Sequence, residues 1–156
     1  MRIAKLYLET TIFNYYFDSE RDAYADTLSL FAEIEKGLYQ AYTSVYALQE
    51  LRNAPSEKSE KMLSLVDKYN IIVLDFSTEA EHLANDYISK GVIPQKYYTD
   101  SIHIAVATVN DLDMIISLSF KHIVRKKTIE LTELINTIKG YRKIGIYTPM
   151  EVVDRE

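Results

Sequence analysis

The sequence contains no cysteine, and it has only four glycines and three prolines in 156 residues. Without cysteine, neither a disulfide framework nor a thiolate metal site can form. No apolar stretch approaches the roughly 20 residues that cross a bilayer, and the N-terminus shows no signal-peptide pattern. We therefore expect a cytoplasmic protein without a membrane partner, in which few glycines or prolines interrupt the regular structure.

Basic residues are also scarce, with 18 Lys and Arg against 23 Asp and Glu, a formal net charge of −5 and a pI near 5.3. A nucleic-acid binder is usually expected to carry a basic face, so any such face must be local here. The best candidate is the segment "FKHIVRKK" at 120–127, followed by "KGYRK" at 139–143. The alternative, that this charge run is only a solvated surface, stays open.

Short apolar runs that are mostly continuous predict strands covered by helices on both faces. They lie at 3–8, 39–43, 71–74, 114–117 and 144–147. Between them, apolar residues at helical spacing fall in the segments 24–37, 45–55, 62–69, 78–91, 102–109 and 131–140. Strands that alternate with helices predict a three-layer α/β/α fold around a mostly parallel sheet of about five strands. The length fits a single domain over residues 1–156.

Local signals mark several helix ends. Ser44 is a candidate N-cap for one helix, and Thr78 with Glu81 resembles a capping box at the start of another. Gly37 and Gly140 predict the C-terminal ends of two helices, because glycine readily adopts the left-handed conformation that ends them.

The familiar catalytic motifs are missing. The sequence has no G-x-G-x-x-G, no P-loop, no serine in a nucleophile elbow and no H-E-x-x-H pattern. A phosphatase-type domain would favour a D-x-D pair after the first strand, where this chain reads E-T-T at 9–11. A nucleotide-binding, serine-hydrolase or zinc-hydrolase site is therefore poorly supported.

Acidic residues near strand ends and helix starts remain as candidates. Glu9 follows the first predicted strand, Glu50 lies in the helix after the second, and Asp100 begins the helix "TDSIHIAVAT". Ligands of such sheets bind at the C-terminal ends of the strands. Carboxylates that converge there repel one another unless a hard cation such as Mg²⁺ or Mn²⁺ joins them, and such ions promote phosphodiester hydrolysis.

Each acid also has an ordinary explanation. Asp100 suits the helix dipole in a first turn. Glu50 in mid-helix is compatible with simple exposure, and Glu9 with capping of the next turn. His103, one helical turn after Asp100, is either a packed histidine or a hydrogen-bond donor to a ligand side chain.

Four segments in this order resemble the signature segments of PIN-domain proteins. They are "YLETTIFNYYF", "TSVYALQELRNAP", "YYTDSIHIAVATVNDLDMIISLSFKHI" and "YTPMEVV", and they extend over nearly the whole chain. Within the third, "LSFKH" is similar to the W-N-F-K-H pattern of one bacterial and archaeal subgroup.

The resemblance implies an endoribonuclease that depends on Mg²⁺ or Mn²⁺. Many members of the family are toxins of toxin–antitoxin pairs, which implies an antitoxin-like protein as partner. The resemblance also makes a homodimer plausible. The metal ligands would be Glu9, Glu50 and Asp100, and Ser119 would be a weak ligand or would position water. The hydrogen-bonding neighbours of the ligands would be Thr10 and His103, and the RNA contacts would be Lys121, Arg125 and Lys126.

This chain departs from the family pattern at three positions. Glu9 stands where the family usually has aspartate, Ser119 where it has an acid or amide, and Thr99 where a second acid often occurs. Two interpretations follow. The chain is either a working nuclease with a shifted metal geometry, or a catalytically inactive PIN-like module that binds RNA or a partner protein.

Overall fold

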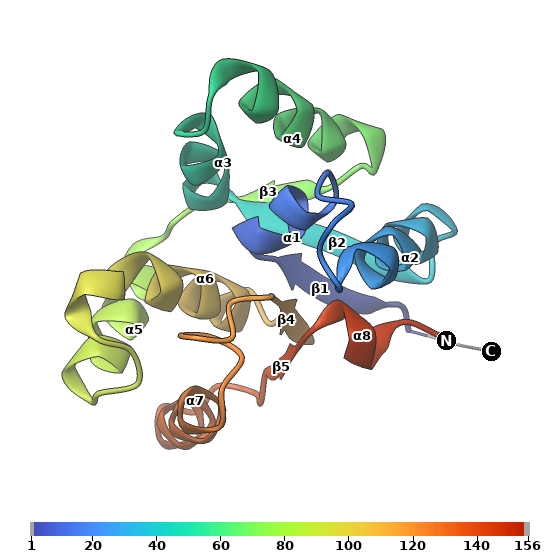
Figure 1. Cartoon of the computed structure of the whole chain (residues 1–156). Coiled ribbons are helices and arrows are strands. Elements are labelled where there is room, and N and C mark those ends of the chain that lie inside the picture. The colour runs from blue at the N-terminus through green and yellow to red at the C-terminus, as the bar shows by residue number, and fades with distance from the viewer. Residues whose placement is uncertain (1, 155–156) are drawn as a thin grey trace.

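Five parallel strands form one sheet in the order β3-β2-β1-β4-β5 (Figure 1). The protein is represented by a computed structural model that describes residues 2–154. Every strand pair is parallel, which confirms the predicted sheet. The strands are β1 (Ala4–Leu8), β2 (Tyr39–Ser44), β3 (Ile72–Leu74), β4 (Met114–Ile116) and β5 (Gly145–Tyr147). Each lies within about one residue of its predicted segment.

Strand β1 carries the alternation that builds a core on each face of the sheet. Leu6 and Leu8 are fully buried in one cluster, whereas the ring of Tyr7 between them is fully buried in the other. Successive strand residues point to opposite faces, so a strand covered on both faces reads as a continuous apolar run. The three-layer arrangement follows from this pattern.

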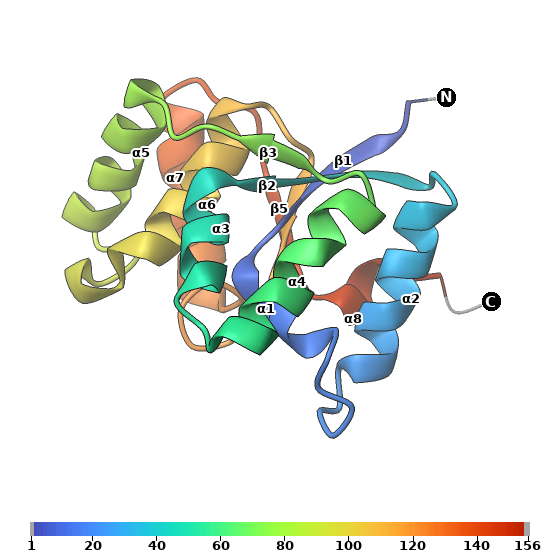
Figure 2. The same ribbon diagram turned by 90° about the horizontal axis from the view of Figure 1, so that it is seen from above.

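The helices divide between these two faces (Figures 1 and 2). The Leu6 side packs against α1 (Thr10–Tyr15), α2 (Tyr24–Glu35), α4 (Ser56–Lys68) and the short α8 (Pro149–Val152). The Tyr7 side packs against α5 (Thr78–Ser89), α6 (Tyr98–Val109) and α7 (Lys126–Ile138). Helix α3 (Val45–Arg52) contacts both α4 and α6.

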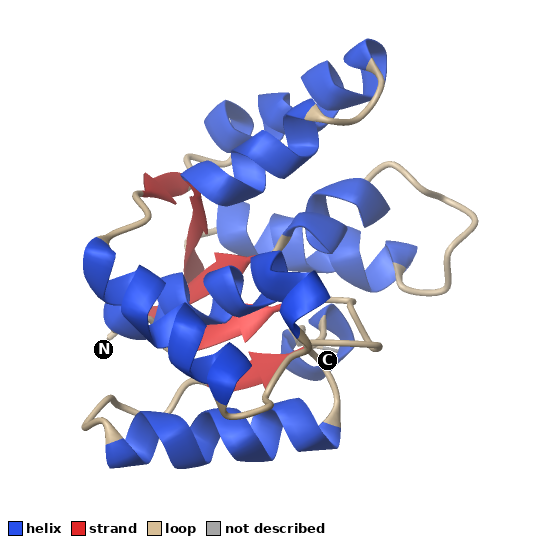
Figure 3. Cartoon of the chain, turned by 90° about the vertical axis from the view of Figure 1, so that its left-hand side faces the viewer, coloured by secondary structure: helices blue, strands red, loops and turns tan. Residues whose placement is uncertain are grey.

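The strand order reverses between β1 and β4, and this reversal locates the site. The chain moves from β1 to β2 and β3 on one side, and β4 and β5 lie on the other. Because every strand pair is parallel, the C-terminal ends of the strands lie at the same edge of the sheet; Figure 3 shows the strands in red among the helices in blue. In sheets of this kind, ligands bind outside the C-terminal ends of the strands where the order reverses.

The helix-end predictions were correct in part. Ser44 caps α3, accepting a hydrogen bond from the backbone N–H of Ala47 at 3.1 Å. The Thr78 capping box was wrong, because Ser77 is the N-cap of α5 and accepts from the N–H of Ala80 at 3.1 Å. The chain is still extended at Ser77, so Thr78 is already the first helical residue.

Two predicted glycine stops are confirmed. Gly37 follows α2 and Gly140 follows α7, each with φ of 82°, a conformation that costs other residues energy.

Three short elements have no counterpart in the sequence prediction. They are α1, α8 and the 3₁₀ turn η1 (Gln95–Tyr97), each too short to show an apolar period. Helix α8 nevertheless carries a capping box between Thr148 and Glu151. Within residues 2–154, no helix has the length and apolar character needed to span a membrane.

Candidate acidic site

Glu9 lies directly after β1, and its carboxylate is held by a cage of three hydroxyl groups. The residue is only 3% exposed. The hydroxyl of Thr10 donates to Oε2 at 2.7 Å, and the hydroxyls of Thr11 and Ser117 donate to Oε1 at 2.6 and 2.7 Å. Glu9 occupies the N-cap position of α1, but its side chain makes no capping hydrogen bond. The carboxylate is therefore held in place by side chains and is not used to cap the helix.

Two of these hydroxyls also anchor the loop that follows β4. Thr11 Oγ1 accepts from the N–H of Leu118 at 2.8 Å, and Ser117 Oγ accepts from the N–H of Ser119 at 3.0 Å. The predicted site residue Ser119 thus reaches the acid only through its backbone, whereas Ser117 touches Glu9 directly. The loop and the carboxylate form one hydrogen-bonded unit.

Sequence reasoning missed Ser117 and Thr11. The strand register would have identified Ser117. Leu8 pairs with Ile116, so the residues that directly follow them, Glu9 and Ser117, lie side by side. Ser117 was assigned to the apolar run of its strand, so this pairing could not be read before the register was known.

We expect Thr11→Val to lower the free energy of unfolding by about 2–4 kcal/mol. The change removes a hydrogen bond to a buried charge and leaves the Leu118 N–H without a partner. Urea unfolding measures this loss. Thr10→Val is the matched control, because its hydroxyl makes only the Glu9 bond, and it should cost less. Equal stabilities of the Thr11 variant and the natural protein would contradict the anchoring role.

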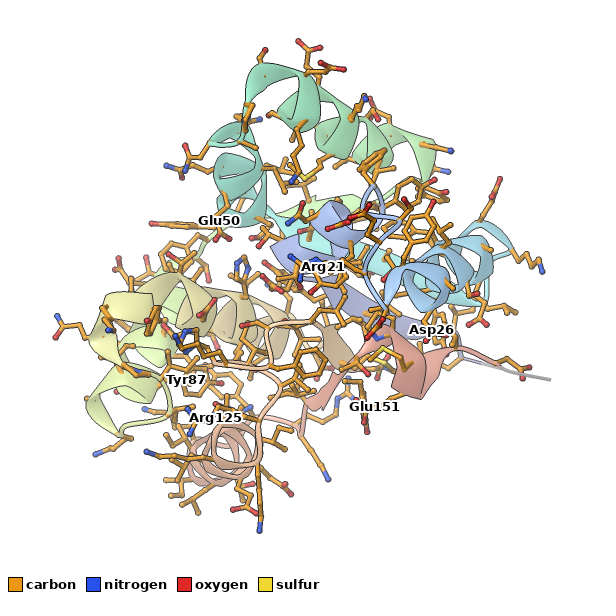
Figure 4. All side chains as sticks on the ribbon, viewed as in Figure 1. Arg21, Asp26, Glu50, Tyr87, Arg125 and Glu151 are labelled. Atoms are coloured by element: carbon orange, nitrogen blue, oxygen red, sulfur yellow. The ribbon has the colours of Figure 1, made fainter. Side chains whose placement is uncertain are left out.

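Glu50 lies on α3 and faces α6 (Figure 4). Its Oε1 is 2.5 Å from Nε2 of His103, a residue of α6 that is completely buried. The other ring nitrogen, Nδ1, lies 2.5 Å from the hydroxyl of Tyr7, which lies 2.7 Å from Oγ of Ser44. This chain of contacts connects Glu50 through the core to the N-cap of its own helix.

The surroundings of His103 favour its charged form. Burial of the ring opposes the imidazolium, but the hydrogen bond and charge of Glu50, with the charges of Glu9 and Asp100, outweigh it and raise the pKa of His103. In the charged ring both nitrogens donate, Nε2–H to Glu50 and Nδ1–H to the hydroxyl oxygen of Tyr7, which can donate in turn to Ser44. Burial strongly raises the pKa of the Tyr7 hydroxyl, so that hydroxyl keeps its proton.

Asp100 lies in the first turn of α6 and completes the set of predicted acids. Burial, followed by the negative charges of Glu9 and Glu50, raises its pKa to about 6, although His103 acts in the opposite direction. The Asp100 carboxyl on α6 therefore lies within electrostatic reach of Glu9, which follows β1, and of Glu50 on α3.

The predicted RNA contacts lie in the loop after β4 and at the start of α7. Lys121 and Arg125 are exposed, and Arg125 is the N-cap of α7 (Figure 4). Lys126, the first residue of that helix, is 3.8 Å from Glu130 in an exposed ion pair. Thr99, which replaces the second family acid, is partly buried just before Asp100.

Comparison with solved structures identifies the architecture. The chain is similar to VapBC from Salmonella typhimurium in a DNA-bound crystal structure, with a TM-score of 0.60, 16% identity and coverage of 94% of this chain and 99% of that chain. It is also similar to VapBC2 from Rickettsia felis, bound to a DNA fragment from its promoter, with a TM-score of 0.55, 16% identity and coverage of 92% and 98%. The chain has a PIN-like fold.

A third similar structure is VapC20 from Mycobacterium tuberculosis, described as a toxin that cleaves the sarcin–ricin loop. Its TM-score is 0.54 at 12% identity, over 70% of this chain and 86% of that chain. No protein-family model and no curated protein matches the sequence. The likeness is therefore one of fold.

The PIN-like fold raises the question of whether these residues suit a metal ion. Their oxygen donors match the preference of Mg²⁺ and Mn²⁺. Within residues 2–154, however, no three acidic or histidine side chains are grouped closely enough to hold a metal. Hydroxyls occupy both oxygens of Glu9, and His103 occupies one oxygen of Glu50. The donors fit a hard cation in chemistry, while their arrangement is not that of an assembled metal site.

Proposed function

We propose that this chain is a metal-dependent endoribonuclease with a PIN-like fold, whose acidic site is formed by Glu9, Glu50 and Asp100. The observation that carries the proposal is the position of the three acids, with Glu9 directly after β1, Glu50 on α3 and Asp100 in the first turn of α6, at the sheet edge where ligands of this fold class bind. Burial, and after it the charges of Glu9 and Glu50, raises the pKa of Asp100. Glu50 is paired with His103, whereas Glu9 is held only by neutral hydroxyls and Asp100 forms no ion pair within residues 2–154, so these two carboxylates favour cation binding. Mg²⁺ or Mn²⁺ bound there would promote hydrolysis of an RNA phosphodiester.

Each residue has a distinct part in this proposal. Glu9 is fixed by its hydroxyl cage, and Glu50 by His103, which in turn is held by Tyr7. Asp100 makes no side-chain hydrogen bond within residues 2–154, and a bound cation would offset the burial and the neighbouring charges that oppose its ionised form. Ser119 is joined to the cage by its backbone N–H, which donates to Ser117 Oγ, and we propose that its hydroxyl positions water.

The partners are proposed from the same likeness. Two of the similar structures are VapBC assemblies, and the third is a VapC toxin that cleaves RNA of the sarcin–ricin loop. We propose that this chain is likewise the toxin of a toxin–antitoxin pair, with RNA as substrate and an antitoxin-like protein as inhibitor. Homodimer formation stays a prediction that sedimentation analysis would test.

The test combines cleavage with cation binding. We expect the purified protein to cut a single-stranded RNA in Mn²⁺ and to lose this activity in EDTA. Calorimetric titration with Mn²⁺ should show one binding event that weakens below about pH 6, where Asp100 takes up a proton. RNA that stays intact at all Mn²⁺ concentrations, together with no binding heat, would contradict the proposal.

A second candidate is a catalytically silent PIN-like module that binds RNA or a protein. It is favoured by the absence of a three-ligand metal group within residues 2–154 and by the hydroxyls that occupy both oxygens of Glu9. The same titration separates the two functions. RNA binding without Mn²⁺ heat and without cleavage would identify the silent module.

A further inference from the structure

An exposed aromatic ring and three cations lie together next to the acidic site, on segments that are distant in the sequence. Phe120 is 54% exposed, unusual for a phenylalanine, and it lies in the loop anchored to Glu9. Its neighbour Lys121 is exposed as well. The exposed ring lies three residues from Ser117, which touches the site acid.

The loop that carries Phe120 is well ordered by its own hydrogen bonds. The N–H of Phe120 donates to the carbonyl of Leu118 at 3.0 Å, and those of Ile123 and Val124 donate to the carbonyl of Ser119 at 3.0 and 2.9 Å. The hydroxyl of Thr128 donates to the carbonyl of His122 at 2.6 Å. The ring is therefore presented from a fixed backbone next to Glu9.

A ring stack brings a third cation to this loop from another part of the chain. The rings of Tyr97 and His122 lie with centroids 3.6 Å apart and planes 30° from parallel. The ammonium of Lys96 lies 5.1 Å from the centre of the Tyr97 ring. Because Tyr97 ends the turn η1 just before α6, the stack connects the segment that leads to Asp100 with the loop after β4.

Three cations from two segments act on His122. Burial, then the positive charges of Lys121, Arg125 and Lys96, lowers the pKa of His122. Within residues 2–154, none of these three cations forms an ion pair with a carboxylate. Three unpaired positive charges on a chain of net charge −5 form a surface suited to a polyanion.

We propose that Phe120 is a stacking platform for an unpaired RNA base, and that Lys96 joins Lys121 and Arg125 in binding the phosphates on either side of it. This inference rests on the proposed ribonuclease function. It adds Phe120 and Lys96 to the residues that contact RNA, and it requires that the bound nucleotides are unpaired. Stacking on an aromatic ring needs an unstacked base, which a duplex does not offer. Cations alone would bind single-stranded and duplex RNA through their phosphates.

Binding without cleavage tests the proposal. In EDTA and on an Asp100→Asn background, the affinity for a fluorescein-labelled 12-nucleotide single-stranded RNA is measured by anisotropy. We expect Phe120→Ala to weaken binding about tenfold and Phe120→Trp to preserve it. Lys96→Gln should reduce the slope of log affinity against log salt by about 1. A 12-base-pair RNA duplex should show no effect of Phe120→Ala.

Matched controls lie at the opposite edge of the sheet, between α2 and β2. Leu38 is 55% exposed, and Lys36 is an exposed helix C-cap. Leu38→Ala and Lys36→Gln should leave RNA affinity unchanged. The proposal is overturned if Phe120→Ala binds single-stranded RNA as tightly as Leu38→Ala does, or if it weakens duplex binding equally.

Failure of this inference and failure of the proposed function give different results. A natural protein that cleaves RNA in Mn²⁺ while Phe120→Ala binds normally would refute the platform and keep the nuclease. Loss of binding in Phe120→Ala, together with no cleavage by the natural protein, would keep the platform and refute the nuclease.

Discussion

Replacing Asp100 by asparagine is expected to lower Mn²⁺-dependent RNA cleavage at least 100-fold and, at the same time, to stabilise the metal-free protein at pH 8. The first effect follows because the variant lacks one of the three proposed cation ligands. The second follows because burial and the charges of Glu9 and Glu50 raise the pKa of Asp100 to about 6. A charge that its surroundings oppose destabilises the folded state.

The sign of the pH dependence follows from the two states of the chain. Unfolded Asp100 ionises near pH 3.9, whereas the folded residue ionises near 6. Folding therefore becomes less favourable as the pH rises between these values, and the penalty is complete above about pH 6. After allowance for solvent screening of this partly exposed residue, we expect Asp100→Asn to gain about 1–2 kcal/mol at pH 8. The gain should fall to about half at pH 5 and nearly vanish at pH 4.

Urea unfolding in EDTA at pH 4, 5 and 8 measures this gain, and an RNA cleavage assay in Mn²⁺ measures the loss of activity. Asp75→Asn is the matched control, because Asp75 is exposed between β3 and α5 and is not one of the three site acids. The control should change neither property. An Asp100 variant that is no more stable at pH 8 than at pH 4, relative to the natural protein, would show that neither burial nor the charges of Glu9 and Glu50 oppose the ionised form of Asp100.

A substitution that strengthens the fold while it removes activity would indicate a site kept at a cost in stability. Most substitutions of partly buried residues destabilise a protein. The exceptions are expected where a functional arrangement opposes folding. The combined outcome therefore separates a working acidic site from three carboxylates that meet without function.

The fold was predictable from the sequence because the pattern repeats along the chain. Five apolar runs alternate with helical stripes, and this regularity determines a parallel sheet whatever the details of each element. Glu9 could be placed at the functional edge for the same reason, since it directly follows the first run. Short elements such as α1 and α8 escaped prediction because four to six residues make one to two helical turns, too few to show a repeating apolar spacing.

Contacts within the site were less accessible, because they depend on register and on side-chain direction. Ser117 touches Glu9 only because β1 and β4 pair Leu8 with Ile116, and nothing in either segment alone states that pairing. Lys96 reaches the loop after β4 only through the stack of Tyr97 on His122. The sequence predicts which acids lie at the functional edge of the sheet. It does not predict which distant residues contact them, because those contacts form only in the folded chain.

Glu9→Asp is the second substitution with a large expected effect. The structure predicts that it impairs the site, whereas the family pattern predicts an improvement. The family pattern, which usually has aspartate here, implies that the shorter acid would improve the site. The hydroxyl cage is built for the longer one, with contacts of 2.6–2.7 Å from Thr10, Thr11 and Ser117. Aspartate would withdraw the carboxylate by about one C–C bond, ~1.5 Å, and break these hydrogen bonds.

We expect Glu9→Asp to lower the free energy of unfolding by about 2–4 kcal/mol, because a buried carboxylate would lose charge-assisted hydrogen bonds. Cleavage should fall by about 100-fold, the usual consequence of moving a catalytic group by ~1 Å. Urea unfolding and RNA cleavage in Mn²⁺ measure the two effects.

Glu9→Gln separates length from charge, because glutamine keeps the reach of the side chain and the hydroxyls can rotate to bind its amide. It should stay within about 1 kcal/mol of the natural stability and still lose cleavage. If Glu9→Asp instead proves more active than the natural protein, the cage does not position this acid for catalysis. The length of the glutamate side chain then limits the rate of RNA cleavage. If the variant proves less stable and less active, Thr10, Thr11 and Ser117 are the residues that adapt this PIN-like fold to a glutamate.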